Sequence, residues 1–150
     1  MLKISQKCYY AIRAVLELAG RPPGIPTTIN VISKAQRIPA KFLAVILAQL
    51  RRGGIVDAIR GTQGGYVLAV SPAALTVARV IACMDGATEP VLCLRSGGDD
   101  DCERRGHCAV ARLWNRAARA VEQVFAGTTF QDLIDEQQAA SRALACNYSI

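Results

Sequence analysis

The chain has 150 residues, of which 51% are apolar and 5% aromatic, so it can bury one sizeable core built mainly from aliphatic side chains. No segment is long and apolar enough to span a membrane, and residues 1–7 lack the apolar run of a signal peptide. We therefore expect a cytoplasmic protein with reduced thiols. The net charge is +6, but residues 1–70 carry ten basic and two acidic side chains, whereas residues 71–150 carry eight and ten. This asymmetry favours a polyanionic partner for the N-terminal half.

The first third of the chain predicts three helices in close succession. Apolar residues repeat at helical spacing from Ile4 to Ala19, and glycine then ends the first helix. Thr27 and Thr28 suit the N-cap of a short second helix, and Pro39 suits the first turn of a third that runs to about residue 52. The apolar positions are Ile29, Val31, Ile32 and Ala35 in the second helix and Phe42, Leu43, Ile46, Leu47 and Leu50 in the third.

A hairpin follows these helices. Residues 55–60 predict a strand, residues 61–65 a glycine-rich turn and residues 66–69 the returning strand. Three helices and a hairpin in this order are typical of a winged helix-turn-helix, in which the third helix enters the major groove of DNA. The predicted fold class is therefore mainly α with a small β-hairpin wing.

Basic side chains occupy the positions that such a fold would turn toward DNA. Lys41 lies in the first turn of the third helix, Arg51 and Arg52 lie at its end, and Arg60 lies at the wing. Solvated arginines on an amphipathic helix beside an ordinary hairpin would explain any one of these features. Their order and tight spacing favour DNA binding.

The second half predicts a fourth helix over residues 76–85, a cysteine loop, a long helix from about residue 108 and a last short helix ending near residue 138. A helix this long at the end of a small domain favours packing on a symmetry mate, because DNA-binding proteins of this kind are usually two-fold dimers. Its apolar stripe is Val110, Leu113, Trp114, Ala117, Val121, Val124 and Phe125. The expected units are a DNA-binding domain (1–85), a cluster-binding loop (86–107), a dimerisation helix with the short helix (108–138) and a tail (139–150).

Three cysteines stand in a polar stretch that cannot form a packed core. Eight residues separate Cys93 from Cys102, and five separate Cys102 from Cys108. Thiolates converging from one loop are the ligands of an iron–sulfur cluster or a zinc ion. Zinc is the weaker prediction, because structural zinc sites favour closely spaced cysteine pairs. A disulfide switch between Cys102 and Cys108 is a further alternative.

An iron–sulfur cluster usually takes four protein ligands. His107 is one candidate for the fourth ligand, but it directly precedes Cys108, so two adjacent residues would have to reach one cluster; this favours an ordinary exposed loop histidine. Cys8 is the other candidate, but it lies on the apolar stripe of the first helix, which favours a buried structural thiol. One of the aspartates 99–101, a small thiol or water would also complete the set. An electron-transfer protein or an enzyme is disfavoured, because the chain has one histidine and no phosphate-binding glycine motif.

Four stretches resemble the IscR/NsrR/RirA-type winged-helix regulators of bacteria, many of which hold iron–sulfur clusters. They are YAIRA at 10–14, IPAKFL at 38–43 with LRRGGIV at 50–56, RGTQGGYVL at 60–68, and the three-cysteine loop. The resemblance covers nearly all of residues 1–137. It implies a homodimeric transcription factor, usually a repressor, that binds a double-stranded operator and holds a [2Fe–2S] or [4Fe–4S] cluster.

Carried onto matching positions, the resemblance assigns Lys41, Arg51, Arg60 and Thr62 to DNA, with Gln63 beside them in the wing. It assigns the three loop cysteines to the cluster. The chain departs from some relatives at two places: Ala111 stands where they have a histidine, and Ala44 where they have a glutamate on the recognition helix.

Overall fold

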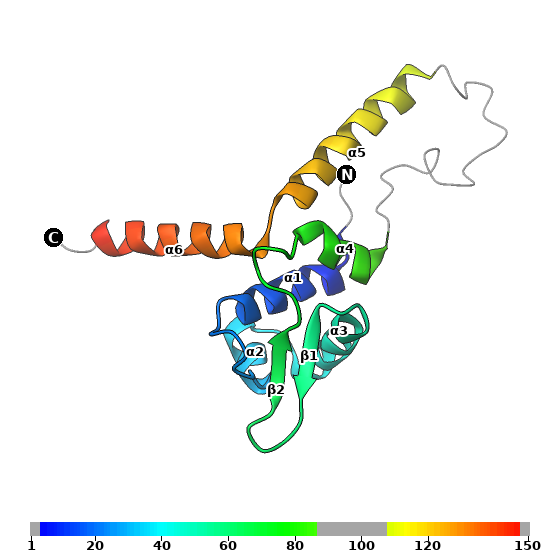
Figure 1. Cartoon of the computed structure of the whole chain (residues 1–150). Coiled ribbons are helices and arrows are strands. Elements are labelled where there is room, and N and C mark those ends of the chain that lie inside the picture. The colour runs from blue at the N-terminus through cyan, green and yellow to red at the C-terminus, as the bar shows by residue number, and fades with distance from the viewer. Residues whose placement is uncertain (1–3, 87–107, 148–150) are drawn as a thin grey trace.

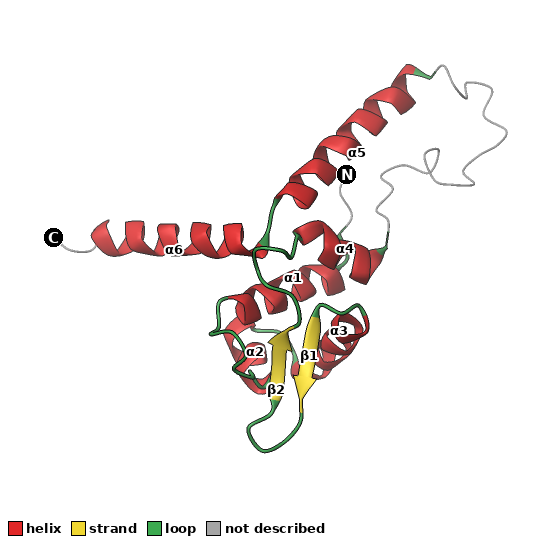
Figure 2. Cartoon of the chain, viewed as in Figure 1, coloured by secondary structure: helices red, strands yellow, loops and turns green. Residues whose placement is uncertain are grey.

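The computed structural model describes residues 4–86 and 108–147, and these form six helices and one antiparallel hairpin (Figures 1 and 2). The mainly helical fold class with a β-hairpin wing is as the sequence predicts. The elements are α1 (Gln6–Ala19), α2 (Ile29–Gln36), α3 (Ala40–Arg52), β1 (Val56–Ile59), β2 (Gly65–Leu68), α4 (Val77–Asp85), α5 (Ala109–Gly127) and α6 (Phe130–Asn147).

The core lies where α1, α3 and α4 meet. α1 contributes small side chains such as Ala11 and Ala14, which are fully buried and let the neighbouring helices approach closely. α4 buries four apolar residues, at the positions that its helical spacing predicts. The largest fully buried side chains are Val15, Ile32, Ile38, Leu43, Ile46, Leu47, Leu50, Ile55, Val56, Leu75, Val80 and Phe130.

A tight connection sets the angle between α2 and α3. Arg37 adopts the left-handed conformation (φ 52°) after α2, and Pro39 caps α3. Ser33 holds the turn, because its carbonyl accepts from the Ile38 amide at 3.0 Å and its hydroxyl donates to the Ile38 carbonyl at 2.6 Å. The buried Ile38 side chain then fixes the turn on the core.

The hairpin pairs Val56 with Leu68 and Ile59 with Gly65. It is anchored to the segment before α2, because Thr27 and Tyr66 exchange two backbone hydrogen bonds of 2.9 and 2.8 Å. A side chain at Gly65 would place its Cβ 2.6 Å from the Thr27 backbone, so this close approach requires glycine.

The turn between α5 and α6 is joined to the segment before α4. The Val77 amide donates to the Thr128 carbonyl at 3.0 Å, and the Phe130 amide donates to the Leu75 carbonyl at 2.9 Å. The Phe130 side chain is fully buried. From this turn α5 and α6 diverge, as Figure 1 shows. None of the described residues of α5 is buried within the chain.

Several predicted details were wrong. α6 continues to Asn147, whereas the sequence predicted a last short helix ending near residue 138 and gave no clear signal for residues 139–150. Its second half is rich in alanine, which favours a helix even without a periodic apolar face. β1 is shorter than the predicted strand 55–60, and β2 is shifted by one residue from the predicted 66–69. Of the apolar positions predicted for α2, only Ile32 is buried. Phe42 is 38% exposed and packs edge-on against Tyr10, because it lies on the flank of α3.

Threonine caps also differ from the prediction. Thr28 occupies the N-cap of α2, but its side chain makes no capping hydrogen bond. Thr27 instead is buried at the contact with the hairpin. Within residues 4–86 and 108–147, no helix has the length and apolarity that crossing a membrane requires.

Candidate nucleic-acid interface and cysteine residues

The outward face of α3 carries the predicted DNA-contacting side chains. Lys41 lies in the first turn and Arg51 and Arg52 in the last, and all three are exposed. The opposite face is made of four apolar residues that are each 0% exposed, so the core fixes which face meets solvent. The sequence of α3 includes no acidic residue. Its solvent face therefore carries positive charge near both ends and no opposing charge of its own.

The wing is anchored at the end of α3. The Ile55 amide donates to the Leu50 carbonyl at 3.0 Å, so β1 begins where α3 ends. Arg60 directly follows β1, and Thr62 and Gln63 lie in the turn, with all three exposed. The hairpin lies beside α3 in Figure 1. An exposed arginine on a projecting hairpin is suited to the backbone or the minor groove of DNA.

Most of the predicted cluster ligands lie outside the described residues. These are Cys93, Cys102, His107 and the aspartates 99–101. Cys108 is half-buried at the N-cap of α5, so the loop ends where the long helix begins. In the described ranges, 4–86 and 108–147, no group of three or more His, Cys, Asp or Glu side chains is placed to hold a metal ion. The donor set in the sequence, three thiols within sixteen residues, fits an iron–sulfur cluster chemically.

Cys8 is a buried thiol, as its place on the apolar stripe predicts. It is 0% exposed on α1 and forms part of the core. Burial raises the pKa of its thiol to about 12, and the nearby charge of Asp85 acts in the same direction. A metal ligand must be the thiolate. The structure of α1 therefore disfavours Cys8 as a fourth ligand.

A polar junction links the candidate recognition helix to α1 and α4. The Gln49 side chain of α3 donates to the Cys83 carbonyl at 2.8 Å and to the Met84 carbonyl at 3.3 Å, and it accepts from the Lys7 ammonium. The Cys83 thiol in turn lies 3.7 Å from the Gln49 carbonyl. Cys83 was expected in the core; it is half-buried and packs against it. We call this set of four residues, Lys7, Gln49, Cys83 and Met84, the Gln49 junction.

A second contact fastens the end of α4 to the start of α1. Asp85 accepts from the Ser5 amide at 2.9 Å and from the Ser5 hydroxyl at 2.5 Å. The same hydroxyl accepts from the Cys8 amide at 3.0 Å and caps α1. The last residues of α4 before the cysteine loop are therefore tied to α1 and α3.

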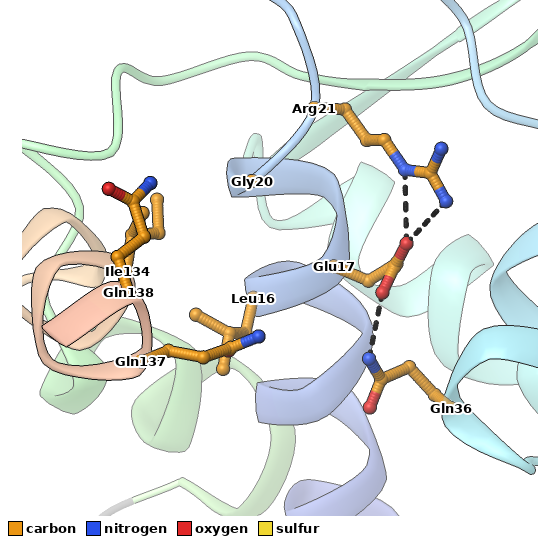
Figure 3. A pocket seen from close by; sticks show the side chains of 8 residues that line it. All are labelled: Leu16, Glu17, Gly20, Arg21, Gln36, Ile134, Gln137 and Gln138. Carbon is orange, nitrogen blue, oxygen red and sulfur yellow. Dashed lines mark hydrogen bonds and ion pairs between the residues drawn. The ribbon is translucent and has the colours of Figure 1, made fainter. Parts of the chain in front are cut away.

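A cleft lies between α1, α2 and α6, away from these features (Figure 3). Its carboxylate, Glu17, is already occupied: one oxygen accepts from Arg21 at 2.6 and 3.0 Å, and the other accepts from Gln36 at 2.8 Å. The remaining lining is mostly glutamine and aliphatic side chains of α1 and α6. The cleft marks where α6 crosses α1 and offers no uncompensated charge to a ligand.

Sequence reasoning missed the Gln49 junction and the Ser5–Asp85 contact. One signal was present, because Gln49 is the one uncharged polar residue in the sequence of α3. A polar side chain at the margin of an apolar face needs a partner. Its partners lie 34 and 35 residues further along the chain, so the sequence alone could not identify them.

Comparison with known proteins identifies relatives along most of the chain. CymR of Bacillus subtilis is 33% identical over 132 residues, which are 88% of this chain and 89% of that protein. Its solved structure, described as that of the global cysteine regulator, superposes with a TM-score of 0.78 over 91% of this chain and 98% of that chain. The structure of IscR from T. potens has a TM-score of 0.75 at 25% identity, covering 93% and 90% of the two chains.

A putative helix-turn-helix transcriptional regulator of Synechocystis is 37% identical over 89 residues, which are 59% of this chain and 60% of that protein. The family model Rrf2, described as an iron-dependent transcriptional regulator, matches residues 4–136. CymR is described as a helix-turn-helix transcriptional regulator, and both solved structures match the winged-helix fold of this chain. The chain belongs to the Rrf2 family of transcriptional regulators.

Proposed function

We propose that the protein is a repressor that binds a double-stranded DNA operator, with α3 in the major groove and the wing at the backbone or the minor groove. The observation that carries this proposal is the solvent face of α3, which is basic near both ends and free of acidic residues, while the core holds its other face. The residues that we assign to DNA are Lys41, Arg51, Arg52, Arg60, Thr62 and Gln63.

The wing assignment is tested by replacing Arg60 with alanine. Loss of one cationic contact should weaken operator binding by about tenfold and lower the slope of log affinity against log salt by about one. Arg142, which is exposed on α6, is the matched control. If the Arg60→Ala and Arg142→Ala variants bind the operator with the same affinity and the same salt slope, the wing assignment is wrong.

We propose further that two copies pair through α5. Its apolar stripe is exposed in the single chain, with Val110 61%, Leu113 57%, Trp114 39% and Val124 62% exposed. A two-fold pair would cover this stripe and present two copies of α3 to two half-sites. Leu113→Asp should therefore give a monomer in analytical ultracentrifugation, whereas the exposed Leu144→Asp on α6 should not. A Leu113→Asp variant that remains dimeric would contradict pairing through α5.

We infer that an iron–sulfur cluster, [2Fe–2S] or [4Fe–4S], is held by Cys93, Cys102 and Cys108 and controls operator affinity. Support comes from the iron-dependent family description, from the three-thiol donor set and from the position of Cys108 at the start of α5. A bound cluster would supply sensitivity to redox state, nitric oxide or iron supply. The fourth ligand that we favour is outside α1, since Cys8 is buried as a neutral thiol.

The Gln49 junction is the contact through which we propose that the loop acts on α3. It joins Gln49 of the recognition helix to the carbonyls of Cys83 and Met84, a few residues before the cysteine loop. A change in the loop that moves the end of α4 would therefore act directly on α3. In this proposal the end of α4 is the shared element of sensing and DNA binding.

A regulator that uses a cysteine thiol, a disulfide or zinc in place of the cluster is the second candidate. The similarity that favours it is to CymR, described as a global cysteine regulator, over 88% of the chain. Visible absorption of anaerobically purified protein, with iron and acid-labile sulfide counted, separates the two. Broad visible bands with matching iron and sulfide support the cluster. Colourless protein that resists reconstitution supports the thiol or zinc mechanism.

Replacing Cys102 tests whether the loop is the sensor. Cys102→Ala should lose the cluster and its effect on DNA affinity, while a Cys146→Ala variant, at the end of α6, should keep both. A Cys102→Ala variant that retains cluster and regulation would refute the assignment of the loop.

A further inference from the structure

Four residues of α3 form one exposed stripe with an apolar centre. Lys41, Val45, Ala48 and Arg52 follow one another at intervals of four, three and four residues, so they share one face of the helix. All four are exposed, and Val45 is 55% exposed. Ala44, also exposed, lies beside them. The stripe therefore begins and ends with a cation and has only methyl-bearing side chains between.

The fold does not explain a valine at this place. Val45 packs on no part of the core, and a β-branched residue is a poorer helix former than alanine, lysine or glutamine. Because α3 is held by four fully buried residues on its other face, its folding does not depend on this side chain. A contact with a binding partner would explain the valine, whereas packing in the core does not.

The central turns of α3 also lack a side chain that could hydrogen-bond a base edge. Gln49 is the one uncharged polar residue of the helix, and its amide is committed to Cys83, Met84 and Lys7. Hydrogen-bonded reading of bases needs a free amide, guanidinium, ammonium, carboxylate or hydroxyl. The middle of this helix therefore has no hydrogen-bonding means of distinguishing bases.

The major groove offers one group that an aliphatic side chain can recognise, the C5-methyl of thymine. Lys41 and Arg52 at the two ends of the stripe supply positive charge for backbone phosphates, so the same face has the charge for DNA and the apolar centre for a methyl group. We propose that Val45, with Ala48 beside it, reads thymine methyl groups in each half-site of the operator. This inference rests on the proposed DNA-binding function of α3.

The test begins with selection of duplexes from a random library by the full-length protein, in each cluster state. Every thymine of the recovered duplex is then replaced singly by deoxyuracil, which removes the methyl group and keeps base pairing and all hydrogen-bonding groups. Loss of one contacted methyl should weaken binding by about fourfold, since burial of one such group is worth roughly 0.8 kcal/mol. Thymines outside the contacted positions provide the internal control.

The effect must depend on Val45. Val45→Ala should bind the thymine duplex more weakly and should lose the difference between thymine and deoxyuracil at the sensitive positions. Leu144→Ala, which removes an exposed aliphatic side chain from α6, should keep that difference. The alanine variant is expected to fold, because Val45 is exposed and alanine favours a helix.

The possible outcomes distinguish failure of methyl reading from failure of the proposed DNA-binding function. If a preferred duplex is recovered but deoxyuracil changes nothing, or changes binding equally in the Val45→Ala variant, then methyl reading is refuted and operator binding stands. If no duplex is preferred in any cluster state, the proposed function fails and the inference fails with it.

Discussion

Replacing Gln49 with leucine isolates the contact that we place between sensing and DNA binding. Leucine fills a similar volume but removes the donor to Cys83 and Met84 and the acceptor for Lys7. A typical intramolecular hydrogen bond contributes about 0.5–1.5 kcal/mol net. The variant loses two well-formed hydrogen bonds and one long one, so its free energy of unfolding should be lower by about 1–3 kcal/mol.

Chemical denaturation at one fixed protein concentration measures this loss. With a urea dependence of about 2 kcal/mol per molar, the midpoint should fall by about 1 M. Gln6→Leu is the matched control, because Gln6 is an exposed glutamine in the first turn of α1. The reasoning also requires that the two cluster states of Gln49→Leu bind operator more equally than those of the wild type. Equal midpoints for the two variants would refute the energetic role of the junction, and unchanged regulation would refute its role in coupling.

Three further predictions follow from the described contacts. Gly65→Ala should lower the melting temperature, because its Cβ would stand 2.6 Å from the Thr27 backbone, whereas Gly127→Ala, with open space around it, should not. Cys8 should resist a thiol reagent at pH 8 in the folded protein and react on unfolding, and rapid native labelling would contradict its burial. Because folding raises the pKa of this thiol from 9.0 to about 12, stability should fall by up to about 1.4 kcal/mol per pH unit between these values. Cys8→Ala should remove that component of the alkaline slope; a slope identical to the wild type would contradict it.

The sequence predicts the parts of this protein that depend on short-range pattern. Helical spacing identifies which face of α3 is buried, and glycines at 61, 64 and 65 identify the wing. The same reasoning fails where partners are far apart in the chain. Thr27 and Tyr66, which are 39 residues apart in the chain, form a β-bridge, and the residues around each of them do not predict it. The length of α6 was underestimated for a different reason, because alanine favours a helix even where apolar residues do not repeat at helical spacing.

The position of α4 explains why small changes at the cysteine loop would suffice for regulation. Its last turn is bound to Gln49 of α3, the proposed recognition helix, and its first residue, Val77, is bound to Thr128 at the turn between α5 and α6. A displacement of α4 would therefore act on α3 and on α5, the helices that we propose for DNA reading and for pairing. In the proposed dimer the Gln49 junction occurs twice, so loss of one hydrogen bond in each copy would change the free energy by about 2 kcal/mol. Since about 1.4 kcal/mol is a tenfold change in affinity, this corresponds to roughly thirtyfold at the operator. Regulation on that scale requires no refolding of the DNA-binding domain, only a changed contact at the end of one helix.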